Sequence, residues 1–167
     1  MDQIAVLAVF AQLAVSLTGF AGLLTAFRGG ADGWSSQEIA GIRNLLITSV
    51  GALAFSAGPI PARAGGAPAS EVFRWASYAV AAFLCIFCAG GLDYVFRLKG
   101  RPRSWAFYWF FILGGLPVAA YLAAGALGVV GGSGVGAYSA GLIWLLSIGV
   151  VQFMFQIFST LTPNDGR

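Results

Sequence analysis

Residues 104–164 read SWAFYWFFILGGLPVAAYLAAGALGVVGGSGVGAYSAGLIWLLSIGVVQFMFQIFSTLTPN and contain no Asp, Glu, Lys or Arg over 61 positions. A single helix of that length, rising about 1.5 Å per residue, would extend roughly 90 Å, whereas the hydrocarbon core of a bilayer is about 30 Å thick. The stretch therefore has to cross the membrane and return. Gly131, Gly132, Ser133 and Gly134 are its one turn-like segment, and they predict the reversal between two spans.

The rest of the chain has the same character. Of its 167 residues, 59% are hydrophobic and 9% are charged, whereas a soluble domain carries about 25% charged residues. We therefore expect an all-α polytopic membrane protein, a single domain over residues 1–167 formed by a bundle of five transmembrane helices. Ser70 is the expected N-cap of the third helix, and residues 59–69 are an expected linker. The predicted spans are about 4–27, 37–58, 71–96, 104–130 and 136–160.

The distribution of basic residues predicts the orientation. Five spans put six cations on one side, namely Arg28, Arg97, Lys99, Arg101, Arg103 and Arg167, and two on the other, Arg63 and Arg74. Because cytoplasmic loops carry the excess of Lys and Arg, we expect the N-terminus outside and the C-terminus in the cytoplasm. Eight arginines to one lysine, with abundant Ala and Gly, are typical of a GC-rich bacterial genome. The expected location is the bacterial inner membrane, with the lipid bilayer as a partner.

The composition also excludes several classes of function. The chain has no histidine, so the commonest metal and haem ligand and the usual proton shuttle are missing. Its six carboxylates are scattered, and its lysine, Lys99, lies in a basic loop. We therefore expect no catalytic residues, no metal ligands and no bound cofactor, and hence not an enzyme. The net charge of +3 arises mainly between residues 97 and 103, which fits a cytoplasmic loop, so nucleic acid is not an expected partner.

Arg43 is the most informative polar residue. It lies seven residues beyond Ser36, about 10 Å into the second span, and Asn44 follows it. A charge at that depth costs a few kcal/mol unless it is paired or reaches the interface. Three interpretations stay open: Arg43 extends to the lipid headgroups, forms an ion pair with Asp93, or lines a pathway for a solute or ion.

Asp93 lies near the end of the third span and has a local alternative partner. Arg97 is four residues further on, so the two side chains share one face of a helix. Small residues at steps of four lead to this carboxylate, and they predict either a tight helix contact or a water-accessible path. They are Ser77, Ala81, Cys85 and Ala89.

Two further features belong to the last two spans. Gln152 and Gln156 lie one turn apart, and amides within lipid form hydrogen bonds between helices, so we interpret them first as packing residues and second as pathway lining. Gly114 and Gly115 precede Pro117, which removes a backbone donor and predicts a kink in the fourth helix. The kink is either a fixed packing feature or a gate.

Cys85 and Cys88 form a C-x-x-C near the middle of the third span. A redox role needs a thiol whose pKa is depressed by nearby positive charge, and the middle of a membrane does not provide it. We expect both to be small, buried, apolar residues, with a membrane redox enzyme as the remote alternative.

Two hypotheses of function follow. The first is a non-catalytic membrane protein that acts through helix–helix assembly, either as a homo-oligomer or as an accessory subunit of a larger membrane complex. Its expected partners are other copies of itself or other membrane subunits. The alternative is a channel or transporter for ions or small solutes, with a polar site at Arg43, Asn44 and Asp93.

Overall fold

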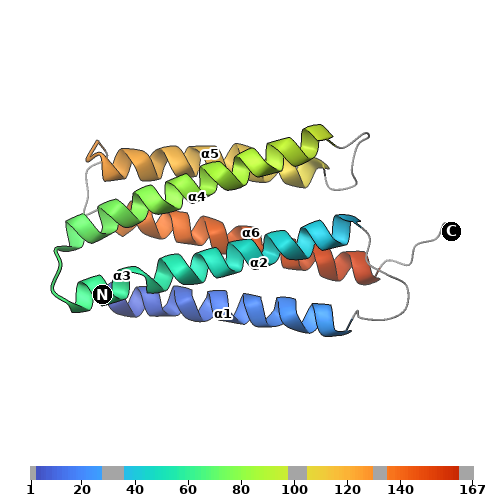
Figure 1. Cartoon of the computed structure of the whole chain (residues 1–167), viewed down its shortest axis with the longest axis horizontal. Helices are drawn as coiled ribbons and strands as arrows, with labels where there is room; N and C mark the ends of the chain where they lie inside the picture. The colour runs from blue at the N-terminus through green and yellow to red at the C-terminus, as the bar shows by residue number, and fades with distance from the viewer. Residues whose placement is uncertain (1–2, 28–35, 98–104, 130–134, 162–167) are drawn as a thin grey trace. The chain divides into compact units, whose positions relative to one another are not determined.

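A computed structural model describes residues 3–27, 36–97, 105–129 and 135–161, and most of these residues are helical (Figure 1). The helices are α1 (Gln3–Phe27), α2 (Ser36–Ala57), α3 (Pro59–Ala64), α4 (Ala69–Arg97), α5 (Trp105–Ala126) and α6 (Val135–Leu161). Five stretches are long and apolar enough to cross a membrane: Gln3–Ala26, Glu38–Ala64, Ala69–Phe96, Trp109–Ala126 and Val135–Phe158. The expected all-α class with five such helices is therefore confirmed.

The helices form two compact units. One comprises residues 1–57 and 145–167, and the other comprises residues 58–144. Helix α6 contributes to both, because its first ten residues, 135–144, belong to the second unit and the remainder to the first. The single-domain organisation that we expect from the sequence stays a prediction.

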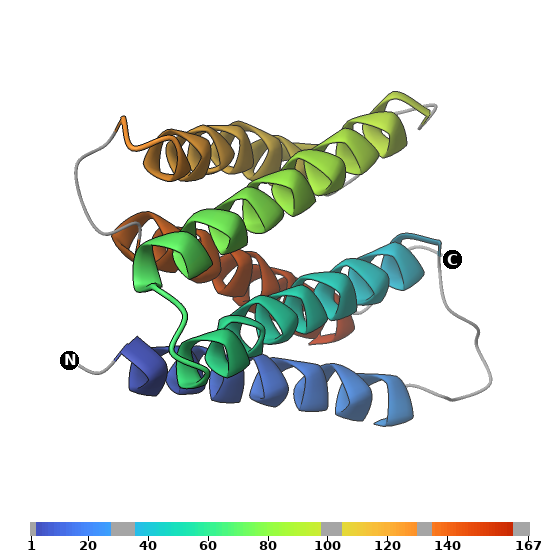
Figure 2. The same ribbon diagram turned by 60° about the vertical axis from the view of Figure 1, so that its left-hand side comes forward.

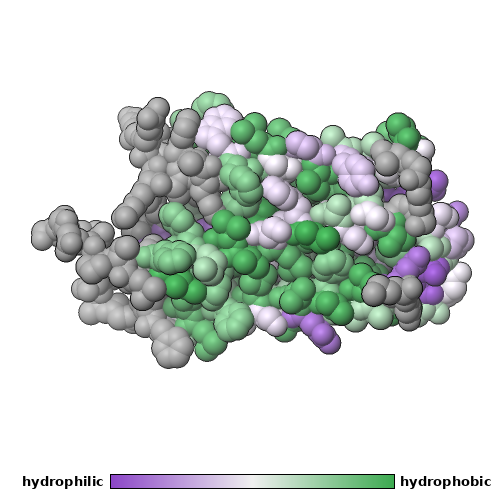
Figure 3. Space-filling view, turned by 180° about the vertical axis from the view of Figure 1, so that it is seen from behind, coloured by the Kyte–Doolittle hydropathy of each residue, from purple (hydrophilic) through white to green (hydrophobic). Residues whose placement is uncertain are grey.

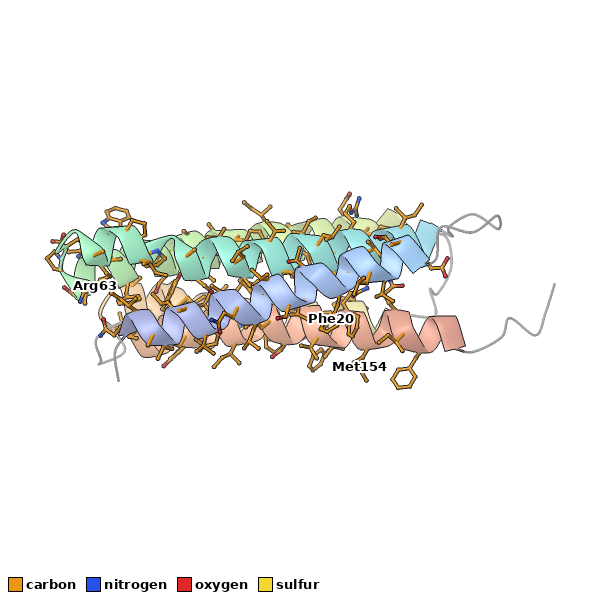
Figure 4. All side chains as sticks on the ribbon, turned by 90° about the horizontal axis from the view of Figure 1, so that it is seen from below. Phe20, Arg63 and Met154 are labelled. Atoms are coloured by element: carbon orange, nitrogen blue, oxygen red, sulfur yellow. The ribbon has the colours of Figure 1, made fainter. Side chains whose placement is uncertain are left out.

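In the first unit, α1 and α2 form an antiparallel hairpin (Figures 1 and 2). Helix α1 buries one stripe of residues spaced three, four and seven apart, which is the spacing of one helical face. The second half of α6 packs on this hairpin, and the rings of Phe20 and Phe153 lie 5.5 Å apart. Figure 4 shows Phe20 and Met154 close together where α1 meets α6. The buried stripe of α1 consists of Leu7, Ala14, Leu17 and Ala21.

In the second unit, α4 and α5 form another antiparallel hairpin (Figures 1 and 2). The first part of α6 lies against both helices. Phe73 of α4 and Tyr138 of α6 are fully buried, with ring centroids 5.4 Å apart. A Cβ atom at Gly141 would lie 2.9 Å from Leu122 of α5 and 3.1 Å from Val80 of α4. The missing side chain therefore allows α6 to approach both neighbours closely.

Helix α5 ends at Ala126, four residues before the predicted boundary at Val130. Gly128 has a φ of 75°, a left-handed conformation that glycine adopts without steric cost. This reversal turns the next backbone N–H groups back onto the helix, with Val129 donating to Ala124 at 3.0 Å and Gly128 to Gly125 at 3.1 Å. The pattern is a glycine C-cap, which stops the helix inside an otherwise apolar sequence.

The segment between α2 and α4 differs from the expected linker, because Pro59–Ala64 forms the short helix α3. Proline at the first helical positions has a suitable φ and lacks an N–H that would otherwise be unpaired. Arg63, labelled in Figure 4, donates a hydrogen bond from Nη1 to the backbone oxygen of Ala67 at 2.5 Å.

The prediction that Ser70 caps the third span is wrong. Helix α4 already begins at Ala69, directly after Pro68. The backbone oxygen of Pro68 accepts hydrogen bonds from the N–H groups of Glu71, at 3.2 Å, and Val72, at 3.1 Å. Ser70 therefore lies within the first turn, where its side chain is exposed.

Large hydrophobic side chains lie on the surface of all five long helices, and Figure 3 shows them gathered along the middle of the helices on the face in view. Ile86 of α4 is 73% exposed and Phe96 is 76% exposed. A soluble protein rarely exposes apolar patches of this extent, so this surface suits contact with lipid.

Candidate functional site

Two glutamines of α6 lie buried against α2. Gln152 and Gln156 are 4% and 3% exposed. The Nε2 atom of Gln156 donates to the backbone oxygen of Glu38 at 3.5 Å, a long hydrogen bond. Gly41 of α2 makes room for both amides, because a Cβ atom there would overlap Nε2 of Gln156 and lie 2.8 Å from Nε2 of Gln152. The amides are therefore packed between α6 and α2.

Further along α2, two hydroxyl groups continue this polar contact. The side chain of Thr48 is fully buried and donates to the backbone oxygen atoms of Asn44, at 2.9 Å, and Leu45, at 3.1 Å. Ser49 is 1% exposed, and its Oγ has no hydrogen-bond partner among the described residues. Gly149 of α6 lies against both, since a Cβ atom there would be 3.5 Å from Ser49 Oγ and 3.7 Å from Thr48 Oγ1.

We call this set the polar layer; it consists of Gly41, Thr48, Ser49, Gly149, Gln152 and Gln156. Its polar groups are hydroxyls and amides, which form hydrogen bonds but do not ionise at physiological pH. Its two glycines bring the backbones of α2 and α6 close together, as small residues do in membrane helices. The arrangement therefore suits rigid helix–helix contact better than proton transfer or metal binding.

Arg43 and Asn44 do not join the polar layer as side chains. Arg43 is exposed although its neighbour Ile42 is buried, so the guanidinium lies on a different side of α2. Asn44 is half-buried and contributes its backbone oxygen to Thr48. The predicted polar centre is therefore gathered only in part within the first unit.

Asp93 and Arg97 lie at the end of α4, in the second unit. Asp93 is exposed, and Arg97 is the last residue of the helix. Because Arg43 belongs to the first unit, the ion pair between Arg43 and Asp93 stays a prediction, as does the local pairing of Asp93 with Arg97.

The small residues that lead to Asp93 do not form one continuous helix contact. Ser77 and Ala81 are buried, whereas Cys85, Ala89 and Asp93 are exposed. Each step of four residues turns about 40° further around an α-helix, so the stripe rotates from the packed face to the outer face. The expectation that both cysteines are buried is therefore wrong for Cys85 and confirmed for Cys88.

Gly114 and Gly115 of α5 form a seat for Trp144 of α6. A Cβ atom at Gly114 would overlap the six-membered ring of Trp144, and one at Gly115 would lie 2.8 Å from Cys88 Sγ. The Trp144 ring also contacts Phe110, at a centroid distance of 5.7 Å. The two glycines thus have a packing role that the sequence analysis missed, while the kink at Pro117 stays a prediction.

These observations define a structural class of protein but no particular function. The chain is a multi-pass α-helical membrane protein by helix length and hydropathy. Within the described ranges, no group of three or more His, Cys, Asp or Glu residues is placed to hold a metal ion. The chain matches no protein-family model, no curated protein and no solved structure.

The role of the polar layer can be tested at Ser49. We expect Ser49→Ala to leave the free energy of unfolding unchanged within about 0.5 kcal/mol, or to raise it, because the lost hydroxyl has no described partner. Thr48→Ala is the control, and it should lower that free energy by about 1 kcal/mol because its hydroxyl is hydrogen-bonded. Reversible unfolding in mixed detergent micelles measures both. A loss above 1 kcal/mol for Ser49→Ala would show that the hydroxyl binds water or an ion.

Proposed function

We propose that this protein is a non-catalytic integral protein of the bacterial inner membrane that acts through helix–helix assembly, as a homo-oligomer or as an accessory subunit of a larger membrane complex. In this proposal its N-terminus lies outside the cell and its C-terminus in the cytoplasm, as the six-to-two distribution of cations favours.

The observation that carries the proposal is where polar side chains lie on the first unit. Gln152 and Gln156, for which pathway lining was the second interpretation, are almost fully buried against α2. In contrast, Gln12 and Ser16 of α1 and Arg43 of α2 are exposed within predicted spans. Polar groups that face lipid are costly, and a neighbouring helix that covers them removes that cost. This distribution supports assembly more than conduction through a single chain.

The proposal predicts the mass of the protein after gentle extraction. Taken from membranes directly into lipid nanodiscs, the chain should appear as a multiple of its own mass or together with other subunits, as measured by light scattering and mass spectrometry. Recovery of single chains alone, at the expression level of the native membrane, would contradict it.

The alternative, a channel or transporter, makes an opposite prediction in the same preparation. Purified protein in liposomes should then conduct an ion or solute, and Arg43→Gln or Asp93→Asn should abolish the flux. Flux with that mutational pattern would replace assembly as the function, whereas its absence over a panel of ions would leave assembly as the better supported proposal.

A further inference from the structure

One side of α1 is exposed along its whole length. The residues on it are spaced three and four apart, so they share one helical face. At about 100° per residue, this face lies opposite the stripe that α1 buries in the first unit. We call it the Gln12 face; it consists of Ala5, Val9, Gln12, Ser16, Gly19 and Leu23.

Gln12 lies near the middle of the span Gln3–Ala26, about 14 Å from its first residue and about 21 Å from its last. Its side chain is exposed and forms no hydrogen bond with another described residue. The hydroxyl of Ser16, one turn away, donates to the backbone oxygen of Gln12 at 3.0 Å and does not reach the amide. In hydrocarbon, an amide with unused donors and acceptors costs several kcal/mol.

The packing within the chain does not require the glycine of this face. A Cβ atom at Gly19 would meet nothing within 4 Å, in contrast to Gly41 and Gly114. Ser16 and Gly19 thus leave a shallow surface beside the amide, where the backbone of another helix can approach closely. The face carries no charged residue that would repel an identical helix.

We propose that the Gln12 face is the contact surface of a parallel homodimer, in which Gln12 of one chain forms hydrogen bonds with Gln12 of a second copy. The inference rests on the proposed assembly function and names its partner. A carboxamide is both donor and acceptor, so it complements itself. Two copies inserted with the same orientation are related by a two-fold axis along the membrane normal, which places Gln12 opposite Gln12 at equal depth.

Disulfide cross-linking in native membranes locates the contact. In a chain carrying Cys85→Ala and Cys88→Ala, single cysteines at Val9, Ser16 and Leu23 should form covalent dimers on oxidation. Val15→Cys is the matched control, because Val15 is 54% exposed but lies about 80° to 120° around the helix from the three test positions. Equal cross-linking at Val15, or none at the three positions, would overturn the proposal.

Substitution of Gln12 tests the hydrogen bonds. Gln12→Leu should raise the dissociation constant of the dimer about tenfold, as expected for loss of interhelical amide bonds, whereas Gln12→Asn should retain most of the affinity. Energy transfer between labelled copies in nanodiscs or diluted micelles measures both.

The outcomes separate this inference from the proposed function. An oligomer that is insensitive to Gln12→Leu, or a Gln12 face cross-linked to a different protein, would overturn the homodimer but leave assembly intact. Single chains under every condition would overturn both.

Discussion

Replacing Gly114 by leucine should lower the free energy of unfolding by about 3 kcal/mol, at the upper end of the cost of overpacking. A Cβ atom at this position would overlap the indole ring of Trp144. The ring cannot move aside easily, because it also contacts Phe110 and Phe111, at centroid distances of 5.7 and 6.5 Å. The indole ring is rigid and has to move as a whole, whereas the end of a flexible side chain can rotate away from the new atoms. Unfolding in mixed micelles, followed by tryptophan fluorescence, measures the loss.

Two variants make the Gly114 experiment specific. Gly90→Leu introduces the same side chain in α4, where a Cβ atom would meet nothing within 4 Å, and it should be nearly neutral. Trp144→Ala should recover part of the stability lost in Gly114→Leu, because it removes the ring that the leucine displaces. If Gly90→Leu and Gly114→Leu cost the same, the effect reflects helix propensity or lipid contact, and the Trp144 seat is not its cause.

Replacing Gly41 by leucine should lower the free energy of unfolding by about 2 kcal/mol. The atoms in the way are the amide groups of Gln156 and Gln152. These are the ends of flexible side chains, so we expect a smaller loss than at Gly114. Their displacement would also break the hydrogen bond from Gln156 to the backbone oxygen of Glu38 and leave amide groups unpaired in the packed layer.

A double-mutant cycle shows whether Gly41 and Gln156 are coupled. Gly41→Ala and Gln156→Ala should each destabilise the protein, and the double variant should lose about 1 kcal/mol less than their sum, because the second change removes the clash of the first. Additive effects would show that Gly41 is not the residue that admits the amides. Gly22→Ala is the control in α1, where a Cβ atom has open space.

Much of the fold could be predicted from the sequence because membrane spans depend on local composition. The 61-residue uncharged stretch and the turn-like sequence at 131–134 predict two helices, which the structure places at Trp105–Ala126 and Val135–Leu161. Where a helix ends is harder to predict. The end of α5 depends on the left-handed conformation of Gly128. The residues on both sides of Gly128 are apolar, so the sequence gives no signal that the helix ends there.

The packing partners could not be predicted, because residue spacing within one helix does not identify what lies opposite. In the sequence, Gly114 and Gly115 suggest a kink in their helix. The structure shows instead that Trp144 of another helix packs against them. Gln12 was missed for a different reason. A lone amide in an uncharged span is visible in the sequence, but only the structure shows that it lies on the exposed side of α1.

The division of α6 between the two units has a consequence for the order of events during synthesis. Helices α1 and α2 leave the ribosome first, and α4 and α5 follow. Both hairpins pack against α6, which is synthesised last. Until α6 is inserted, Gly41 faces no amide and Gly114 faces no indole. A nascent chain that stops before α6 therefore presents two incomplete hairpins to the membrane. Insertion of this one helix supplies the missing packing partners of both units.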